Sequence, residues 1–196
     1  MRQGGDPRPS GSRAVESVYA HFIDEIAAKA REIEASSLDA VARLLRDAQA
    51  RQRKVILVGN GGSAAMASHV AVDLTKVAGI RAVNFNEADL VTCFANDYGY
   101  EQWVAKAIEA YADSGDVVVL ISSSGRSRNI INGATAARAR HAAVVTLSGF
   151  DAGNPLRTLG DVNLWVDSNA YNVVEMAHHI WLLAVVEQLV SERPAG

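Results

Sequence analysis

The stretches Lys54-Val-Ile-Leu-Val-Gly-Asn-Gly-Gly-Ser63 and Asp116-Val-Val-Val-Leu-Ile-Ser-Ser-Ser-Gly-Arg-Ser127 share one pattern. Each is an apolar run that ends in small polar residues and leads into a helical pattern. Such runs predict buried strands of a parallel sheet, each followed by a tight loop at the start of a helix. Backbone N–H groups converge at such a loop, the helix dipole is positive there, and glycine lets a ligand approach the backbone. The two loops therefore predict an anion site.

The second loop carries hydroxyl groups but no lysine. Its serines are Ser122, Ser123, Ser124 and Ser127. A nucleotide P-loop needs the pattern Gly-x-x-x-x-Gly-Lys-Ser/Thr, so this loop suits a small phosphomonoester better than a nucleotide. The alternative is a serine-rich turn that only caps a helix, but four serines around one glycine exceed what capping needs. We therefore expect phosphate binding here, with a weaker contribution from the first loop.

Length, net charge, cysteine content and the length of apolar runs limit which classes of protein the chain can belong to. The length of 196 residues fits one domain with a substantial core. The net charge of −3 and the lack of a basic stripe argue against nucleic acid as a partner. The single Cys93 cannot form an internal disulfide, which fits the cytoplasm. No run approaches the roughly 18 apolar residues of a membrane span, so no membrane partner is expected. Residues 1–13 are expected to be a disordered tail rather than a signal peptide.

Hydrophobic periodicity predicts alternating strands and helices over residues 14–192, which we expect to form a single domain. Ser37 is expected to cap the second helix. The segment Asn96-Asp97-Tyr98-Gly99 is expected to separate two helices. This alternation predicts an α/β fold, a three-layer parallel sheet flanked by helices with an N-terminal helical extension, which binds ligands beyond the carboxyl ends of its strands. The expected helices are about 14–35, 37–52, 63–77, 87–94, 100–111, 127–140 and 170–191, and the strands 55–58, 81–85, 117–121, 143–147 and 162–166.

The expected C-terminal helix is apolar on nearly every face, and the first helix also has more apolar surface than one sheet face needs. Helices that are apolar all round are normally buried, and a chain of this size has little with which to bury them. We therefore expect a helical interface between copies of the chain.

Four motifs, taken in chain order, resemble the sugar isomerase (SIS) domain family, and within it the phosphoheptose isomerases. The resemblance covers residues 14–192 and implies the SIS fold, which is flavodoxin-like or Rossmann-like. It also implies a homotetramer with active sites shared between subunits. The motifs are Gly59-Asn60-Gly61-Gly62-Ser63, His69-x-x-x-Asp73-Leu74-Thr75, Asn96-Asp97-Tyr98-Gly99-Tyr100 and Ile121-Ser122-Ser123-Ser124-Gly125-Arg126-Ser127-x-Asn129.

The resemblance also implies roles for individual residues. The loop serines at 122, 123, 124 and 127 would hold the substrate phosphate. Asp73 stands where the family has the glutamate that acts as catalytic base. The sugar hydroxyl groups would be contacted by Asn60, Gly61, Gly62, Ser63, Asn96 and Asp97.

The C-terminal helix departs from the family pattern. Val174 and Leu182 stand where the family usually has a Gln and a catalytic His, while Glu175, His178 and His179 stand nearby. One interpretation is a rebuilt catalytic site in which Glu175 works with His179 or His178, beside Asp73; a carboxylate and two histidines on an apolar helix are costly to bury without a use. The other is lost activity, with Glu175 and one His paired at a subunit interface. We expect the rebuilt site, with His179 as the partner.

A metal site is a further possibility. His69 and Asp73 are four residues apart and so share one helix face. With Glu175 and His179 they could form a two-His, two-carboxylate zinc site. The resemblance supports this, since some family members bind zinc at matching positions. The expected chemistry itself requires no cofactor.

The function implied is aldose–ketose isomerisation, with sedoheptulose 7-phosphate converted to D-glycero-manno-heptose 7-phosphate through an enediol. One alternative is a non-catalytic SIS protein that binds a sugar phosphate or acts as a tetrameric adaptor. Another is an isomerase of a different sugar phosphate.

Overall fold

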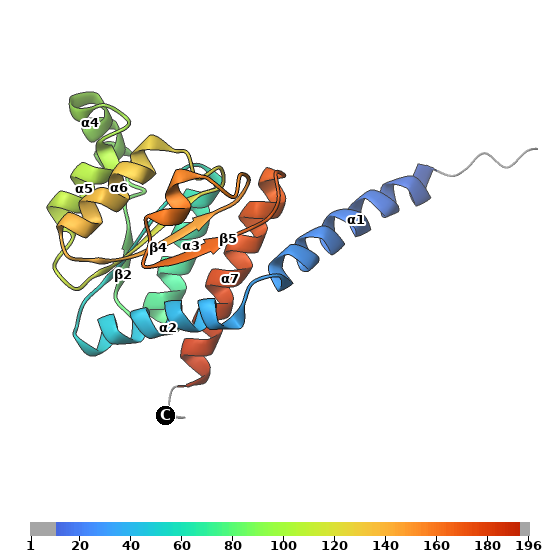
Figure 1. Cartoon of the computed structure of the whole chain (residues 1–196), viewed down its shortest axis with the longest axis horizontal. Coiled ribbons are helices and arrows are strands. Elements are labelled where there is room, and N and C mark those ends of the chain that lie inside the picture. The colour runs from blue at the N-terminus through green and yellow to red at the C-terminus, as the bar shows by residue number, and fades with distance from the viewer. Residues whose placement is uncertain (1–10, 193–196) are drawn as a thin grey trace, which may run out of the picture.

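The computed structural model describes residues 11–192, with the elements labelled in Figure 1. The strands are β1 (Val55–Val58), β2 (Ala82–Asn84), β3 (Val117–Ser122), β4 (Ala143–Ser148) and β5 (Val162–Trp165). The helices are α1 (Gly11–Arg31), α2 (Ala35–Ala50), α3 (Gly62–Lys76), α4 (Ala88–Tyr98), α5 (Trp103–Tyr111), α6 (Arg128–Ala139), the short 3-10 helix η1 (Pro155–Thr158) and α7 (Tyr171–Ser191).

The five strands form one parallel sheet in the order β2-β1-β3-β4-β5. This is the flavodoxin-like order, in which the strand sequence reverses between β1 and β3. Val55 pairs with Val117 and Val58 with Leu120, so the two central strands lie in register. The loops that follow them therefore begin side by side at one edge of the sheet, and the predicted fold class is confirmed.

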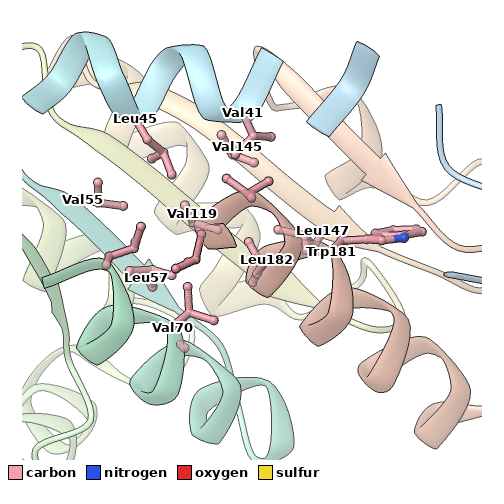
Figure 2. Close-up of a cluster of buried hydrophobic side chains, with 14 of the residues drawn as sticks. Val41, Leu45, Val55, Leu57, Val70, Val119, Val145, Leu147, Trp181 and Leu182 are labelled. Carbon is pink, nitrogen blue, oxygen red and sulfur yellow. The ribbon is translucent and has the colours of Figure 1, made fainter. Parts of the chain in front are cut away.

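Two apolar clusters fill the spaces between the layers. Successive strand residues face opposite sides, so Val55 and Leu57 pack under α2, α3 and α7, while Ile56 and Val58 pack under α5 and α6. Figure 2 shows the first cluster, where Leu182 of α7 lies among strand residues such as Leu147 and Val119. Because both sheet faces are covered, the strands need apolar residues at every position, as the sequence has them.

Helix α1 projects away from the sheet, and only its C-terminal part lies near α7 (Figure 1). There the Trp181 indole N–H donates to the Ala30 carbonyl at 2.8 Å. Farther out, Val18, Tyr19 and Ile23 are 63%, 65% and 63% exposed. An isolated arm with exposed apolar side chains fits the expected interface between copies, which stays a prediction.

Some predicted boundaries were wrong. The second helix begins at Ala35 after Glu34, and the Ser37 N–H donates to the Glu34 carbonyl, so Ser37 is not its cap. Asn96, Asp97 and Tyr98 form the last turn of α4 instead of a linker, and Gly99 ends the helix at φ +85°. Of the predicted tail, residues 11–13 belong to α1, and residues 1–10 lie outside the described residues.

Helix α7 has the length and mean hydropathy of a membrane span, so the expectation that no segment approaches one was too strong. Half of its most apolar window is buried inside the chain. It packs against α1, α2 and α3 and carries Glu175, His178 and His179. These contacts are those of a core helix.

Candidate functional site

A cavity of about 150 Å³ opens where the loops after β1 and β3 meet the first turn of α7. It brings together most of the predicted phosphate loop, two residues of the first loop and one of the predicted catalytic residues. Its lining residues are Asn60, Ser63, Ile121, Ser122, Ser123, Ser124, Ser127, Tyr171 and Glu175.

The serine loop is a tight turn between β3 and α6. The Gly125 N–H donates to the Ser122 carbonyl at 2.9 Å, and Gly125 has φ +64°, a conformation that favours glycine. The Ser122 hydroxyl donates to the Ser127 hydroxyl oxygen at 3.0 Å. Helix α6 begins at Arg128, directly after Ser127, so the positive end of its dipole adjoins the hydroxyls. This arrangement suits a bound phosphate.

The first loop is tied to α6 by a pair of amides. Asn129 Nδ2 donates to Asn60 Oδ1 at 2.8 Å, and Asn60 Nδ2 donates to Asn129 Oδ1 at 3.1 Å. The Tyr100 hydroxyl donates to the same Asn60 oxygen at 3.0 Å. The Asn60 carbonyl is thus engaged, and its remaining amide hydrogen is free for a sugar oxygen. Asn129 and Tyr100 both lie within the motifs quoted above, yet their role in holding Asn60 is visible only in the structure.

Glu175 is the carboxylate of the pocket. It lies against Gly62, the first residue of α3, so closely that a Cβ atom on Gly62 would overlap the carboxylate. The N-terminus of a helix favours a negatively charged group. The sequence therefore uses glycine at 62 to let Glu175 reach the pocket beside Asn60 and Ser63.

Asp73, His69 and His179 form a second cluster. His69 Nε2 lies 3.2 Å from Asp73 Oδ2, and His69 Nδ1 lies 3.0 Å from His179 Nε2. Asp73 is eleven residues beyond Gly62 on α3, which at 1.5 Å per residue places it about 16 Å from the helix start that Glu175 contacts. The predicted residues Asp73 and Glu175 therefore do not share a pocket within one chain.

The two histidines of α7 have different surroundings. His178 is fully buried, and its Nε2–H donates to the Ser148 carbonyl at 3.0 Å. Burial lowers its pKa to about 4, against the opposing effect of that hydrogen bond. His179 is partly exposed, and burial and His69 lower its pKa while Asp73 acts in the opposite direction. His178 is buried and is not among the residues that line the pocket.

Val174 and Leu182 lie in the core. Their side chains are 0% and 3% exposed, and Figure 2 shows Leu182 within the apolar cluster. Val174 packs on Gly149, where a Cβ atom would overlap its methyl groups. Apolar residues at these two positions fit their surroundings, and neither position lines the pocket.

The four residues predicted to bind zinc do not converge in one chain. Both ring nitrogens of His69 already face Asp73 and His179, and Glu175 lies at the start of α3. Over residues 11–192, no three His, Cys, Asp or Glu side chains are grouped as metal ligands. The donor set of a single chain does not fit a zinc ion.

Other predicted contacts lie outside the pocket lining. Asn96 and Asp97 bond to each other at the end of α4, with Asn96 Nδ2 donating to Asp97 Oδ1 at 2.9 Å. Gly61 and Gly62 shape the first loop without lining the cavity, and Gly61 has φ +55°. Their roles in sugar binding stay predictions.

The fold and the serine loop together define a sugar isomerase domain. Residues 18–149 match the SIS domain family, so the chain belongs to that family. It is 36% identical over 165 residues to the phosphoheptose isomerase of Geobacter sulfurreducens, covering 81% of this chain and 86% of that protein. It is 34% identical over 166 residues to the phosphoheptose isomerase of Sodalis glossinidius, covering 80% and 85%.

Solved structures of phosphoheptose isomerases have the same fold as this chain. The phosphoheptose isomerase from Neisseria gonorrhoeae superimposes with a TM-score of 0.81 at 31% identity and covers 90% of this chain and 99% of that one. A phosphoheptose isomerase from Francisella tularensis gives a TM-score of 0.83 at 21% identity, covering 94% and 100%, which supports the fold alone.

Proposed function

We propose that this chain is a phosphoheptose isomerase that interconverts sedoheptulose 7-phosphate and D-glycero-manno-heptose 7-phosphate. The observation that carries the proposal is the cavity in which a serine loop at a helix N-terminus and the Glu175 carboxylate face the same space. The names of relatives that align over most of the chain support the choice of a heptose phosphate.

The serine loop would hold the terminal phosphate, with the sugar extending toward Asn60 and Ser63. Glu175 would remove the proton alpha to the carbonyl group and leave an enediol. Reprotonation at the neighbouring carbon, with proton exchange between O1 and O2, would complete the conversion. No redox cofactor enters this scheme, because the electron pair stays within the sugar.

Asp73 lies about 16 Å along α3 from the Glu175 contact, and His69 joins it to His179, which lies one helical turn after Glu175 on α7. The family resemblance implies tetramers with active sites shared between subunits. We therefore assign this cluster to the pocket of a neighbouring subunit, where His179 would move protons between the sugar oxygens and Asp73 would act through His69. A homotetramer in the cytoplasm is the corresponding assembly. The four predicted zinc ligands do not meet within one chain, and no step of this scheme uses zinc.

A non-catalytic sugar-phosphate-binding or adaptor protein is the second candidate. It is favoured by one observation, the burial of Val174 and Leu182 at positions where the resemblance implies a Gln and a catalytic His. An isomerase for a sugar phosphate of another chain length is a third.

Incubation with sedoheptulose 7-phosphate in deuterated water separates these candidates. We expect solvent deuterium at C1 or C2 and formation of the aldose, both followed by NMR. Absence of exchange with this ketose but exchange with a pentose or hexose phosphate would change the substrate. Absence of exchange with every sugar phosphate, together with retained binding, would establish the adaptor or sensor function.

A further inference from the structure

Asn154 is a buried amide beneath the serine loop. It is 1% exposed and lies between β4 and η1. Its Nδ2 donates to the Ser148 hydroxyl at 3.2 Å and to the carbonyls of Gly149 at 3.2 Å and Asp151 at 2.8 Å. Its Oδ1 accepts the Arg157 N–H at 3.1 Å. The side chain is therefore held from several directions, although the sequence marks it only as a loop residue before proline.

This amide supports the turn of the serine loop. A Cβ atom on Gly125 would overlap the Asn154 amide, so the two groups are in direct contact. The Leu156 N–H donates to the Gly125 carbonyl at 3.2 Å, and the Gly149 N–H donates to the Ser123 carbonyl at 2.8 Å. The segment from Gly149 to Leu156 thus forms the floor on which the loop of hydroxyls lies.

The same network reaches the helix that carries the catalytic carboxylate. Ser148 accepts Asn154 at its hydroxyl and His178 Nε2–H at its carbonyl, the latter at 3.0 Å. Ser148 and His178 are both 0% exposed. His178 lies one helical turn after Glu175 on α7. One chain of buried contacts, from Gly125 through Asn154 and Ser148 to His178, therefore joins the phosphate loop to the helix that presents Glu175.

We propose that Asn154 is a positioning residue that, through Ser148 and His178, fixes the serine loop in its phosphate-binding conformation at a set distance from Glu175. The inference rests on the proposed phosphate role of the serine loop. Asn154 does not line the cavity, so it would act on the ligand through Gly125 and its neighbours. Without the amide, the space beside Gly125 opens, and the loop gains conformations in which its hydroxyls no longer converge.

The test compares Asn154→Ala with a matched control, Asn163→Ala. Asn163 also makes several hydrogen bonds, to Gly160 and Thr146, but none of them is to a residue of the serine loop. Both changes should lower the melting temperature. Calorimetric titration with inorganic phosphate should show about tenfold weaker binding for Asn154→Ala, and no more than about twofold for Asn163→Ala. Turnover of the sugar phosphate should show a raised KM with a smaller change in kcat.

A double-mutant cycle identifies the route of the effect. In a Ser124→Ala, Ser127→Ala background, Asn154→Ala should weaken phosphate binding less than it does in the unmodified chain, because two of the hydroxyls that it positions are gone. An equal cost in both backgrounds, or phosphate affinity unchanged by Asn154→Ala, would overturn the inference.

If the serine changes themselves leave phosphate binding intact, the proposed function fails at the serine loop, and the positioning role fails with it. Should Asn154→Ala not fold, Ser148→Ala removes one bond of the network and should weaken phosphate about threefold; unchanged affinity would overturn the inference.

Discussion

The buried His178 should make the stability of this protein depend on pH between about 4 and 6.5. Burial lowers its pKa from the usual 6.5 to about 4 in the folded chain. Below pH 6.5 the unfolded chain therefore binds a proton that the folded chain does not, so the stability falls as the pH falls. Above pH 6.5 His178 is neutral in both states and costs no stability, and below about pH 4 the loss of stability levels off.

The size of this effect follows from the shift. One pKa unit corresponds to about 1.36 kcal/mol, so the loss approaches roughly 3 kcal/mol at the acid limit and is about 2 kcal/mol at pH 5. That is a large share of the typical stability of a single domain. It should appear as a lower urea midpoint at pH 5 than at pH 7.5, at a fixed protein concentration.

His178→Gln isolates the contribution, because glutamine keeps an N–H donor for the Ser148 carbonyl but does not titrate. We expect its loss of stability from pH 7.5 to 5 to be smaller than that of the unmodified chain by about 2 kcal/mol. His141→Gln, at an exposed position, is the control for removal of a histidine and should follow the unmodified chain. If His178→Gln loses as much stability from pH 7.5 to 5 as the unmodified chain does, then His178 is not a neutral buried donor, and its link to Ser148 is wrong.

Three further predictions concern the site and the assembly. Glu175→Gln should retain sugar-phosphate binding and lose about 10²–10⁴-fold in kcat; unchanged turnover would remove Glu175 as the base. Replacing Ser124 and Ser127 by Ala should weaken sugar-phosphate binding at least about tenfold, because each hydrogen bond to a charged group contributes about 1.5–3 kcal/mol; calorimetric titration with unaltered affinity would place the phosphate elsewhere. Changing Tyr19 and Ile23 on the exposed face of α1 to Lys should reduce the oligomer in sedimentation experiments, and a stable monomer of the unmodified chain at micromolar concentration would refute the interface.

The sheet and its two loops could be predicted from the sequence because the information is local. Runs such as Val55–Val58 are apolar at every position, which only a strand covered on both faces requires. The end of α4 was predicted wrongly because local composition was misleading there. Asn96-Asp97-Tyr98 has the composition of a turn, yet the helix includes these residues and ends only at Gly99, which has a positive φ. The serine loop was identified because its hydroxyls follow one strand directly.

The support of that loop could not be predicted in the same way. Asn154 lies about thirty residues after Gly125, and its importance comes from a contact across the sheet edge that no local pattern records. The separation of Asp73 from Glu175 likewise depends on how α3 and α7 pack. The register of two helices is a tertiary property, set here by Gly62 against Glu175 and by His69 against His179.

The same register shows where the two positions of α7 lie that depart from the pattern the resemblance implies. Residues four apart on a helix lie on one stripe. Val174, His178 and Leu182 form the inward stripe, with exposed fractions of 0%, 0% and 3%. The adjacent stripe of Tyr171, Glu175 and His179 faces the pocket and α3.

Apolar side chains on the inward stripe strengthen the core, while the polar His178 there donates through Nε2 to the Ser148 carbonyl and leaves Nδ1 buried without a hydrogen bond. The groups capable of acid–base chemistry stand one stripe over, where they reach the pocket and His69 without being fully buried. The proposed function therefore does not need the Gln and His that the resemblance implies at 174 and 182, because it draws its carboxylate from Glu175 and its imidazole from the His179 of a neighbouring subunit.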